Sequence, residues 1–146
     1  MVKVKIRKAR KEDRDGILGV IKKRSVLNPK DKSYKELNNY VDFCLSNKNF
    51  LVIIAEFESK IMGVCISHLY SLKETDADIY DLYVIKEFSR KGIGSSLMKF
   101  LCLELKKKGI KNLGLYSENN RKALNFYRKN GFQIGRLIRR CDKKIK

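Results

Sequence analysis

Residues 79–95 read IYDLYVIKEFSRKGIGS, an apolar stretch typical of a strand, a short loop, and then Gly92 and Gly94 at the start of an amphipathic segment. The N–H groups in the first turn of a helix have no acceptor inside the helix, and the helix dipole places partial positive charge there. Glycines let a phosphate group approach these donors, and Arg90 and Lys91 add two positive charges beside them. The stretch therefore predicts a strand, a phosphate-binding loop and a helix in succession.

Two familiar phosphate loops do not match this stretch. A P-loop requires G-x-x-x-x-G-K-[ST], which the loop lacks. A dinucleotide fingerprint requires a third small residue, where this chain has Leu97, and an acid about 20 residues further on. The segment 112–116, NLGLY, contains no acid. The phosphate ligand is therefore of another kind.

A second stretch, residues 120–132, reads NRKALNFYRKNGF. Together the two stretches resemble the GNAT superfamily of N-acetyltransferases, which move an acetyl group from acetyl-CoA to an amine. The first family motif, [Q/R]-x-x-G-x-[G/A] after an L-x-V strand, is matched by Leu82, Val84, Gly92 and Gly94. The second, N-x-x-A-x-x-[FL]-Y-x-x-x-G-F, is matched by Asn120, Ala123, Phe126, Tyr127, Gly131 and Phe132. The order and spacing of the two motifs also fit the family.

The resemblance implies a binding site for acetyl-CoA as cosubstrate. The pantetheine arm would bond to the strand backbone, and the pyrophosphate would rest on the loop amides. The residues so implied are Leu82, Tyr83, Val84, Arg90, Lys91, Gly92, Ile93, Gly94 and Ser95. Asn120 either caps the last helix, bonds the cofactor arm, or does both. Tyr127 occupies the general-acid position of the family and also adjoins the cofactor.

The general base is less clearly marked by the sequence. Relatives that acetylate protein N-termini often have a glutamate five residues before the motif asparagine, where this chain has Leu115. Asp81 is our candidate base, acting directly or through water, with a purely structural role as the alternative. The chain also has Ser89 at the Gln/Arg position of the first motif, and Arg90 and Lys91 can supply the lost charge.

The pattern of apolar residues predicts an α/β fold. We expect helices at 12–24, 33–46, 92–108 and 119–130, and strands at 2–9, 77–85, around 113–115 and at 132–140, with a hairpin over 50–69. The order βααβββαβαβ indicates one GNAT-like domain over residues 1–146, with a mixed six- to seven-stranded sheet and helices on both faces. The strands flanking the 92–108 helix should be parallel.

The net charge of +18 is concentrated at the two ends of the chain. An RNA or DNA surface is one interpretation. We favour a lysine-rich composition that keeps the protein soluble and attracts an anionic cofactor, because no nucleic-acid-binding signature accompanies the charge. The acids Glu74, Asp76, Asp78 and Asp81 lie in one short stretch, which suits a cationic amine acceptor or a solvated hairpin.

The remaining features of the sequence bear on its location and its binding partners. No apolar run is long enough to span a membrane, and we expect a cytoplasmic protein without a membrane partner. Four cysteines without C-x-x-C pairing predict buried free thiols and no metal, and the single histidine, His68, is expected to be structural or at the surface. The resemblance implies an amine acceptor, a small molecule or a protein, and suggests a homodimer. The alternatives are a noncatalytic acyl-CoA-binding or regulatory protein of the same fold, and a basic nucleic-acid-binding protein.

Overall fold

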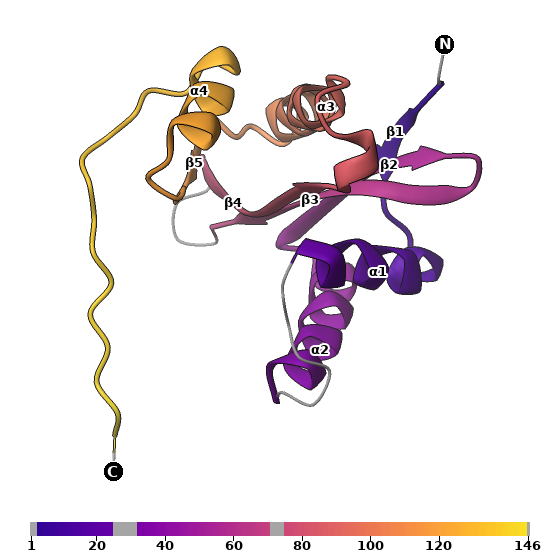
Figure 1. Cartoon of the computed structure of the whole chain (residues 1–146), viewed down its shortest axis with the longest axis horizontal. Coiled ribbons are helices and arrows are strands. Elements are labelled where there is room, and N and C mark those ends of the chain that lie inside the picture. The colour runs from indigo at the N-terminus through magenta and orange to yellow at the C-terminus, as the bar shows by residue number, and fades with distance from the viewer. Residues whose placement is uncertain (1–2, 25–31, 71–74, 146) are drawn as a thin grey trace. The chain divides into compact units, whose positions relative to one another are not determined.

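The computed structural model describes residues 3–24, 32–70 and 75–145, which divide into two compact units, Met1–Leu115 and Tyr116–Lys146. The first unit contains all the strands of the described chain (Figure 1). Its elements are β1 (Lys5–Lys8), η1 (Lys11–Asp13), α1 (Arg14–Arg24), α2 (Lys32–Ser46), β2 (Phe50–Phe57), β3 (Lys60–Leu69), β4 (Asp76–Val84), η2 (Lys86–Phe88), α3 (Ile93–Lys107) and β5 (Asn112–Leu115). The second unit contains α4 (Arg121–Lys129).

The described strands form one mixed sheet in the order β1-β2-β3-β4-β5. Neighbouring strands are antiparallel except for β4 and β5, which are parallel and flank α3 in the sequence. The predicted α/β class, the hairpin over 50–69 and the parallel pair are thereby confirmed. The sheet has five strands rather than the six to seven expected.

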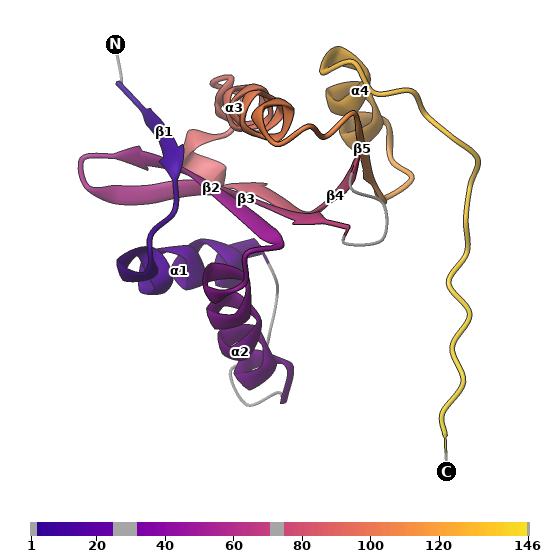
Figure 2. The same ribbon diagram turned by 180° about the vertical axis from the view of Figure 1, so that it is seen from behind.

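Helices cover both faces of this sheet, as predicted: α1 and α2 lie on one face and α3 on the other (Figures 1 and 2). The core between the sheet and the first two helices contains the buried side chains of Ile17, Leu18, Val20, Ile21, Val41, Cys44, Val52, Ile54, Met62, Val64, Ile66 and Ile85. On the opposite face α3 approaches β3 closely, since a β-carbon added to Gly63 would lie 3.1 Å from Cδ1 of Leu97. The sheet is therefore held between two apolar layers.

The helices of the first unit agree with the predicted ranges to within a few residues. Three apolar residues of α1, namely Ile17, Leu18 and Ile21, are buried. Gly109 follows α3 with a φ of +79°, a conformation that ends helices and that glycine adopts readily. Cys44 and Cys65 are buried free thiols, whereas Cys102 is exposed on α3.

The sixth strand predicted at 132–140 is wrong for the described structure. Residues 132–145 of the second unit form neither helix nor strand, and the segment leaves α4 as an extended trace (Figure 1). Beyond half-buried Phe132 its large apolar side chains are exposed, Leu137 to 66%. A strand exists only where its backbone groups have a ladder partner, and the alternating pattern by itself does not supply one.

Candidate active site

The loop between β4 and α3 is built from backbone turns. After Ile85 the chain makes one turn of 3-10 helix at η2, and Ser89 closes it by donating from Oγ to the carbonyl of Lys86 over 2.8 Å. Arg90 and Gly92 then adopt positive φ angles of 58° and 77°. A left-handed residue followed directly by right-handed ones turns successive N–H groups toward one side, which is an anion-binding arrangement.

The first turn of α3 follows this loop directly. The N–H of Ser96 donates to the carbonyl of Gly92 over 3.0 Å, so Ile93 and Gly94 precede the first such bond of the helix. No side chain caps this end, because Gly92 is the N-cap. The buried side chains of Ile93 and Leu97 anchor this end of the helix in the protein interior. The end of α3 therefore presents backbone donors and partial positive charge on a rigid support.

The two cations of the loop are exposed, but one is already oriented. The ammonium of Lys91 lies 5.1 Å from the ring centroid of Phe88, a cation–π contact. A pocket of about 220 Å³ beside the first turn of α3 is lined by Lys91 together with Val4, Ile6, Ile93 and Ser96. The loop thus combines backbone donors, positive charge and open space.

Strand β4 has one side that is only partly paired. On the β5 side the pairing runs from Asp76 opposite Asn112 to Ile79 opposite Leu115 and then stops, while β4 continues to Val84. On the β3 side the pairing continues, and Ile85 N–H donates to the carbonyl of Met62. No strand of the described chain pairs with the β5 side of residues 80–84, which we call the free edge of β4.

The register decides which backbone groups point to this free edge. In an antiparallel pair, residues bonded to the partner strand alternate with residues whose groups point the other way. Since Ile85 bonds to β3, Tyr83 opposite Val64 also does, and Leu82 and Val84 direct their N–H and C=O groups to the free edge. Of the three strand residues singled out by the sequence, Leu82 and Val84 are therefore the ones with available backbone.

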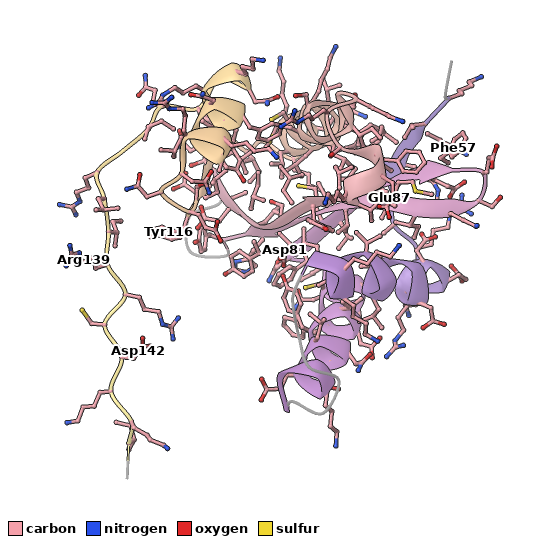
Figure 3. The ribbon with its side chains drawn as sticks, viewed as in Figure 1. Phe57, Asp81, Glu87, Tyr116, Arg139 and Asp142 are labelled. Carbon is pink, nitrogen blue, oxygen red and sulfur yellow. The ribbon has the colours of Figure 1, made fainter. Side chains whose placement is uncertain are left out.

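A β-bulge in β4 lies directly before Asp81, the candidate base. Ile66 of β3 pairs with Asp81 and Ser67 pairs with Ile79, so Tyr80 is an extra residue in β4. The Asp81 carboxylate accepts a hydrogen bond of 2.8 Å from the hydroxyl of Tyr40 in α2. Figure 3 shows Asp81 on the side of the sheet that carries α1 and α2. Asp81 is thus held in place by a residue 41 positions away.

The second unit contains the other two predicted site residues. Asn120 is the N-cap of α4, and its Oδ1 accepts from the N–H of Ala123 over 2.8 Å, which confirms the predicted cap. Tyr127 is half-buried, and its ring makes edge contacts with Phe126 and Phe132 at centroid distances of 5.2 and 5.6 Å. These contacts fix the orientation of the phenol within its own unit.

Sequence reasoning missed two residues that support this site. Tyr40, which holds Asp81, gave no signal because its partner is far away in the sequence. Gly114 of β5 was also missed: a β-carbon there would lie 2.7 Å from Oδ1 of Asp78, its partner in the ladder. The only available signal was a glycine within a short strand, which often marks a close approach. Glu74, the first of the four clustered acids, lies outside the described residues.

No group of three or more His, Cys, Asp or Glu side chains in residues 3–24, 32–70 and 75–145 is arranged to hold a metal ion. Within those ranges, no helix has the length and apolarity that a membrane crossing requires.

Comparison with known proteins identifies the family of the chain. The family model of the acetyltransferase (GNAT) domain matches residues 48–134. A curated relative from Archaeoglobus fulgidus, named as an uncharacterized N-acetyltransferase, is 30% identical over 103 residues, which cover 66% of this chain and 69% of the relative.

Solved structures show the same fold. An aminoglycoside acetyltransferase from an uncultured soil metagenomic sample, in complex with sisomicin, is 22% identical, with a TM-score of 0.78 over 98% of this chain and 97% of that one. The aminoglycoside acetyltransferase AAC(6')-Iy with a bisubstrate analogue is 13% identical, with a TM-score of 0.84 over 98% and 99%. A predicted acetyltransferase from Clostridium acetobutylicum with acetyl-CoA is 21% identical, with a TM-score of 0.80 over 96% of each chain.

The fold and the family match define the protein as an acetyltransferase. The chain belongs to the GNAT superfamily, as its two sequence motifs predicted, and it is an N-acetyltransferase.

Proposed function

We propose that the protein moves the acetyl group of acetyl-CoA directly to a primary amine. The observation that carries this proposal is the loop of residues 90–95, at the N-terminus of α3 and at the end of a strand with a free edge. The pyrophosphate binds the N–H groups of this loop, assisted by the charges of Arg90 and Lys91. The pantetheine arm bonds to the free-edge backbone of Leu82 and Val84.

The proposal also gives a location for the acetyl end of the cosubstrate. An arm that starts at the loop and follows the free edge of β4 is stopped where β5 begins to pair, at Ile79 opposite Leu115. The thioester accordingly lies near Tyr80 and Asp81. Support for CoA binding also comes from the Clostridium acetobutylicum structure, which contains acetyl-CoA.

The transfer requires a neutral amine, because an ammonium has no lone pair. The amine nitrogen attacks the carbonyl carbon of the thioester, a C–N bond forms and the C–S bond breaks. We assign Asp81 as the group that removes the proton of the amine, directly or through one water. The hydrogen bond from Tyr40 fixes the carboxylate for this role.

The leaving thiolate takes a proton from Tyr127 in the proposed mechanism. A phenol keeps its proton at neutral pH, and transfer to a forming thiolate neutralises that charge. Asn120 fixes the start of the same helix and so supports the position of Tyr127 along it.

Turnover by the purified full-length chain tests the proposal. Acetyl-CoA is supplied with a panel of amines that contains linear diamines, aminoglycosides, amino acids and peptides, and release of the CoA thiol is followed. We expect release that depends on at least one amine. Calorimetric binding of acetyl-CoA without any turnover would instead support the noncatalytic alternative, and absence of binding would remove the cofactor site altogether.

A further inference from the structure

Four aromatic side chains form a cluster with the only histidine of the chain. His68 of β3 lies 4.7 Å from Phe50, 5.2 Å from Tyr70 and 5.5 Å from Tyr80, measured between ring centroids. Phe50 also contacts Tyr80 at 5.9 Å and Phe43 at 5.4 Å. We call these residues, Phe43, Phe50, His68, Tyr70 and Tyr80, the His68 cluster.

This cluster is not closed off as a core would be. Tyr80 is 48% exposed and Phe43 is 53% exposed, although both contact other rings. Tyr80 is also the extra residue of the bulge in β4, and its hydroxyl lies 3.4 Å from Nδ1 of His68. The bulge therefore presents an aromatic surface to solvent beside the place where the free edge of β4 begins.

One carboxylate contacts this cluster, and a second follows Tyr80 in the sequence. Asp78 is the ladder partner of His68, and its Oδ2 accepts a hydrogen bond from the hydroxyl of Tyr70. Its Oδ1 lies over Gly114, where the lack of a side chain leaves room for it. A carboxylate has about four acceptor positions, so this bond leaves Asp78 able to accept others. On the other side of Tyr80, Asp81 is held by Tyr40.

We propose that the His68 cluster binds a protonated ammonium group of the acceptor, and that the acceptor is therefore an amine with at least two amino groups. This inference rests on the proposed function for the reacting group. One nitrogen loses its proton and attacks the thioester, while a second stays charged and is held between the ring of Tyr80 and the carboxylate of Asp78. Cation–π attraction and a charged hydrogen bond are the two interactions that select such a group.

The charge of the whole chain strengthens this argument. A protein with a net charge of +18 repels cations at long range. A cationic acceptor consequently needs a local site of opposite character, and the His68 cluster with Asp78 and Asp81 provides one. Aliphatic polyamines and aminoglycosides share the required chemistry, and the test below separates them.

The first experiment compares two amines of equal carbon number, the diamine cadaverine and the monoamine pentylamine, with acetyl-CoA and the full-length chain. We expect a higher kcat/KM for cadaverine. Tyr80→Leu should lower the ratio of the kcat/KM for cadaverine to that for pentylamine about three- to thirtyfold, the range that one cation–π contact supplies. Asp78→Asn, which keeps the side-chain shape, should act in the same direction. Tyr116→Leu changes a tyrosine that is 84% exposed and serves as the control.

A second measurement does not depend on turnover. Since His68 is the only histidine, an untagged chain gives one set of imidazole NMR signals that need no assignment. The inference is supported if cadaverine or sisomicin shifts the His68 signals saturably and pentylamine at equal concentration does not. A response to cadaverine indicates a linear polyamine acceptor, and a response to sisomicin indicates an aminoglycoside. Such shifts without acetylation of any amine would retain the binding site and reject the proposed function. The inference would be overturned if cadaverine and pentylamine shifted the His68 signals equally, or if Tyr80→Leu lowered kcat/KM for the two amines by the same factor.

Discussion

At the scale of single residues, the general-acid role that we propose for Tyr127 gives the most direct test. Tyr127→Phe removes one oxygen and keeps the ring contacts with Phe126 and Phe132. General acid catalysis contributes about 10²–10⁴-fold, and water can replace part of it, so we expect kcat to fall at least about tenfold. Affinity for acetyl-CoA should change little. Steady-state kinetics with calorimetry check both values, and Tyr116→Phe is the matched control. Unchanged kcat in a folded variant would assign the proton to another group.

Gly94 tests the phosphate loop more cleanly than Gly92. Gly92 has a φ of +77°, where a side chain strains the backbone whatever the ligand. Gly94 lies inside α3 with an ordinary helical conformation, so Gly94→Val adds bulk at the N-terminus without that strain. We expect acetyl-CoA to bind at least about tenfold more weakly, because the side chain blocks approach to the backbone donors. Cys102→Val, further along the same helix at an exposed position, should bind normally.

At the scale of elements, α1 offers a matched pair of glycines. A β-carbon at Gly19 meets nothing within 4 Å, whereas one at Gly16 would lie 2.7 Å from Cδ1 of Ile61. Gly19→Ala should therefore stabilise the protein by about 0.5–1 kcal/mol through helix propensity. Gly16→Ala should be less stable than Gly19→Ala by about 1 kcal/mol or more, because Ile61 must move. Urea unfolding of the two variants measures the difference, and equal stability would contradict the packing of α1 on β3.

The contact between β1 and α3 depends on one glutamate. The carboxylate of Glu104 forms ion pairs of 2.8 Å with the ammonium groups of Lys107 and Lys8. These pairs hold the pKa of Glu104 at about 2, below the ordinary 4.5. A lowered pKa in the folded state stabilises the protein above the unfolded pKa, and this stabilisation is lost as the pH falls. Glu104→Gln should lower the free energy of unfolding at pH 7. The difference in the free energy of unfolding between the variant and the wild type should decrease as the pH falls from about 4.5 toward about 2. A difference that stays constant over that range would exclude the ion pairs as its cause.

At the scale of the whole molecule, the basic ends should be separable from catalysis. Replacing Lys143, Lys144 and Lys146 with Gln removes three charges from the end of the chain. We expect acetyl transfer to a small amine to change less than about twofold, since the charged loop of the cofactor site is retained. If the same variant lost an RNA affinity that the wild type shows at physiological salt, the nucleic-acid alternative would replace our interpretation of the charge.

The sequence predicted the elements whose signals are local. The glycines of the loop, the apolar hairpin over 50–69 and the cap at Asn120 were readable because each depends on neighbouring residues. The bulge at Tyr80, the bond from Tyr40 to Asp81 and the space over Gly114 depend on residues brought together by folding. The strand predicted at 132–140 was wrong because alternating apolar residues indicate a propensity for β structure, and they do not show that a neighbouring strand is available for pairing.

The free edge of β4 has a consequence for handling the protein. An open strand edge is a template for strand addition, so in the absence of cosubstrate we expect a second chain to pair with it and the protein to self-associate. A cosubstrate arm bonded there acts as a surrogate strand. Ligands that bind only the folded state raise its stability in proportion to the logarithm of their concentration. Acetyl-CoA should therefore raise the melting temperature and suppress concentration-dependent turbidity together, so that the cosubstrate serves the enzyme as a stabilising part of its own sheet.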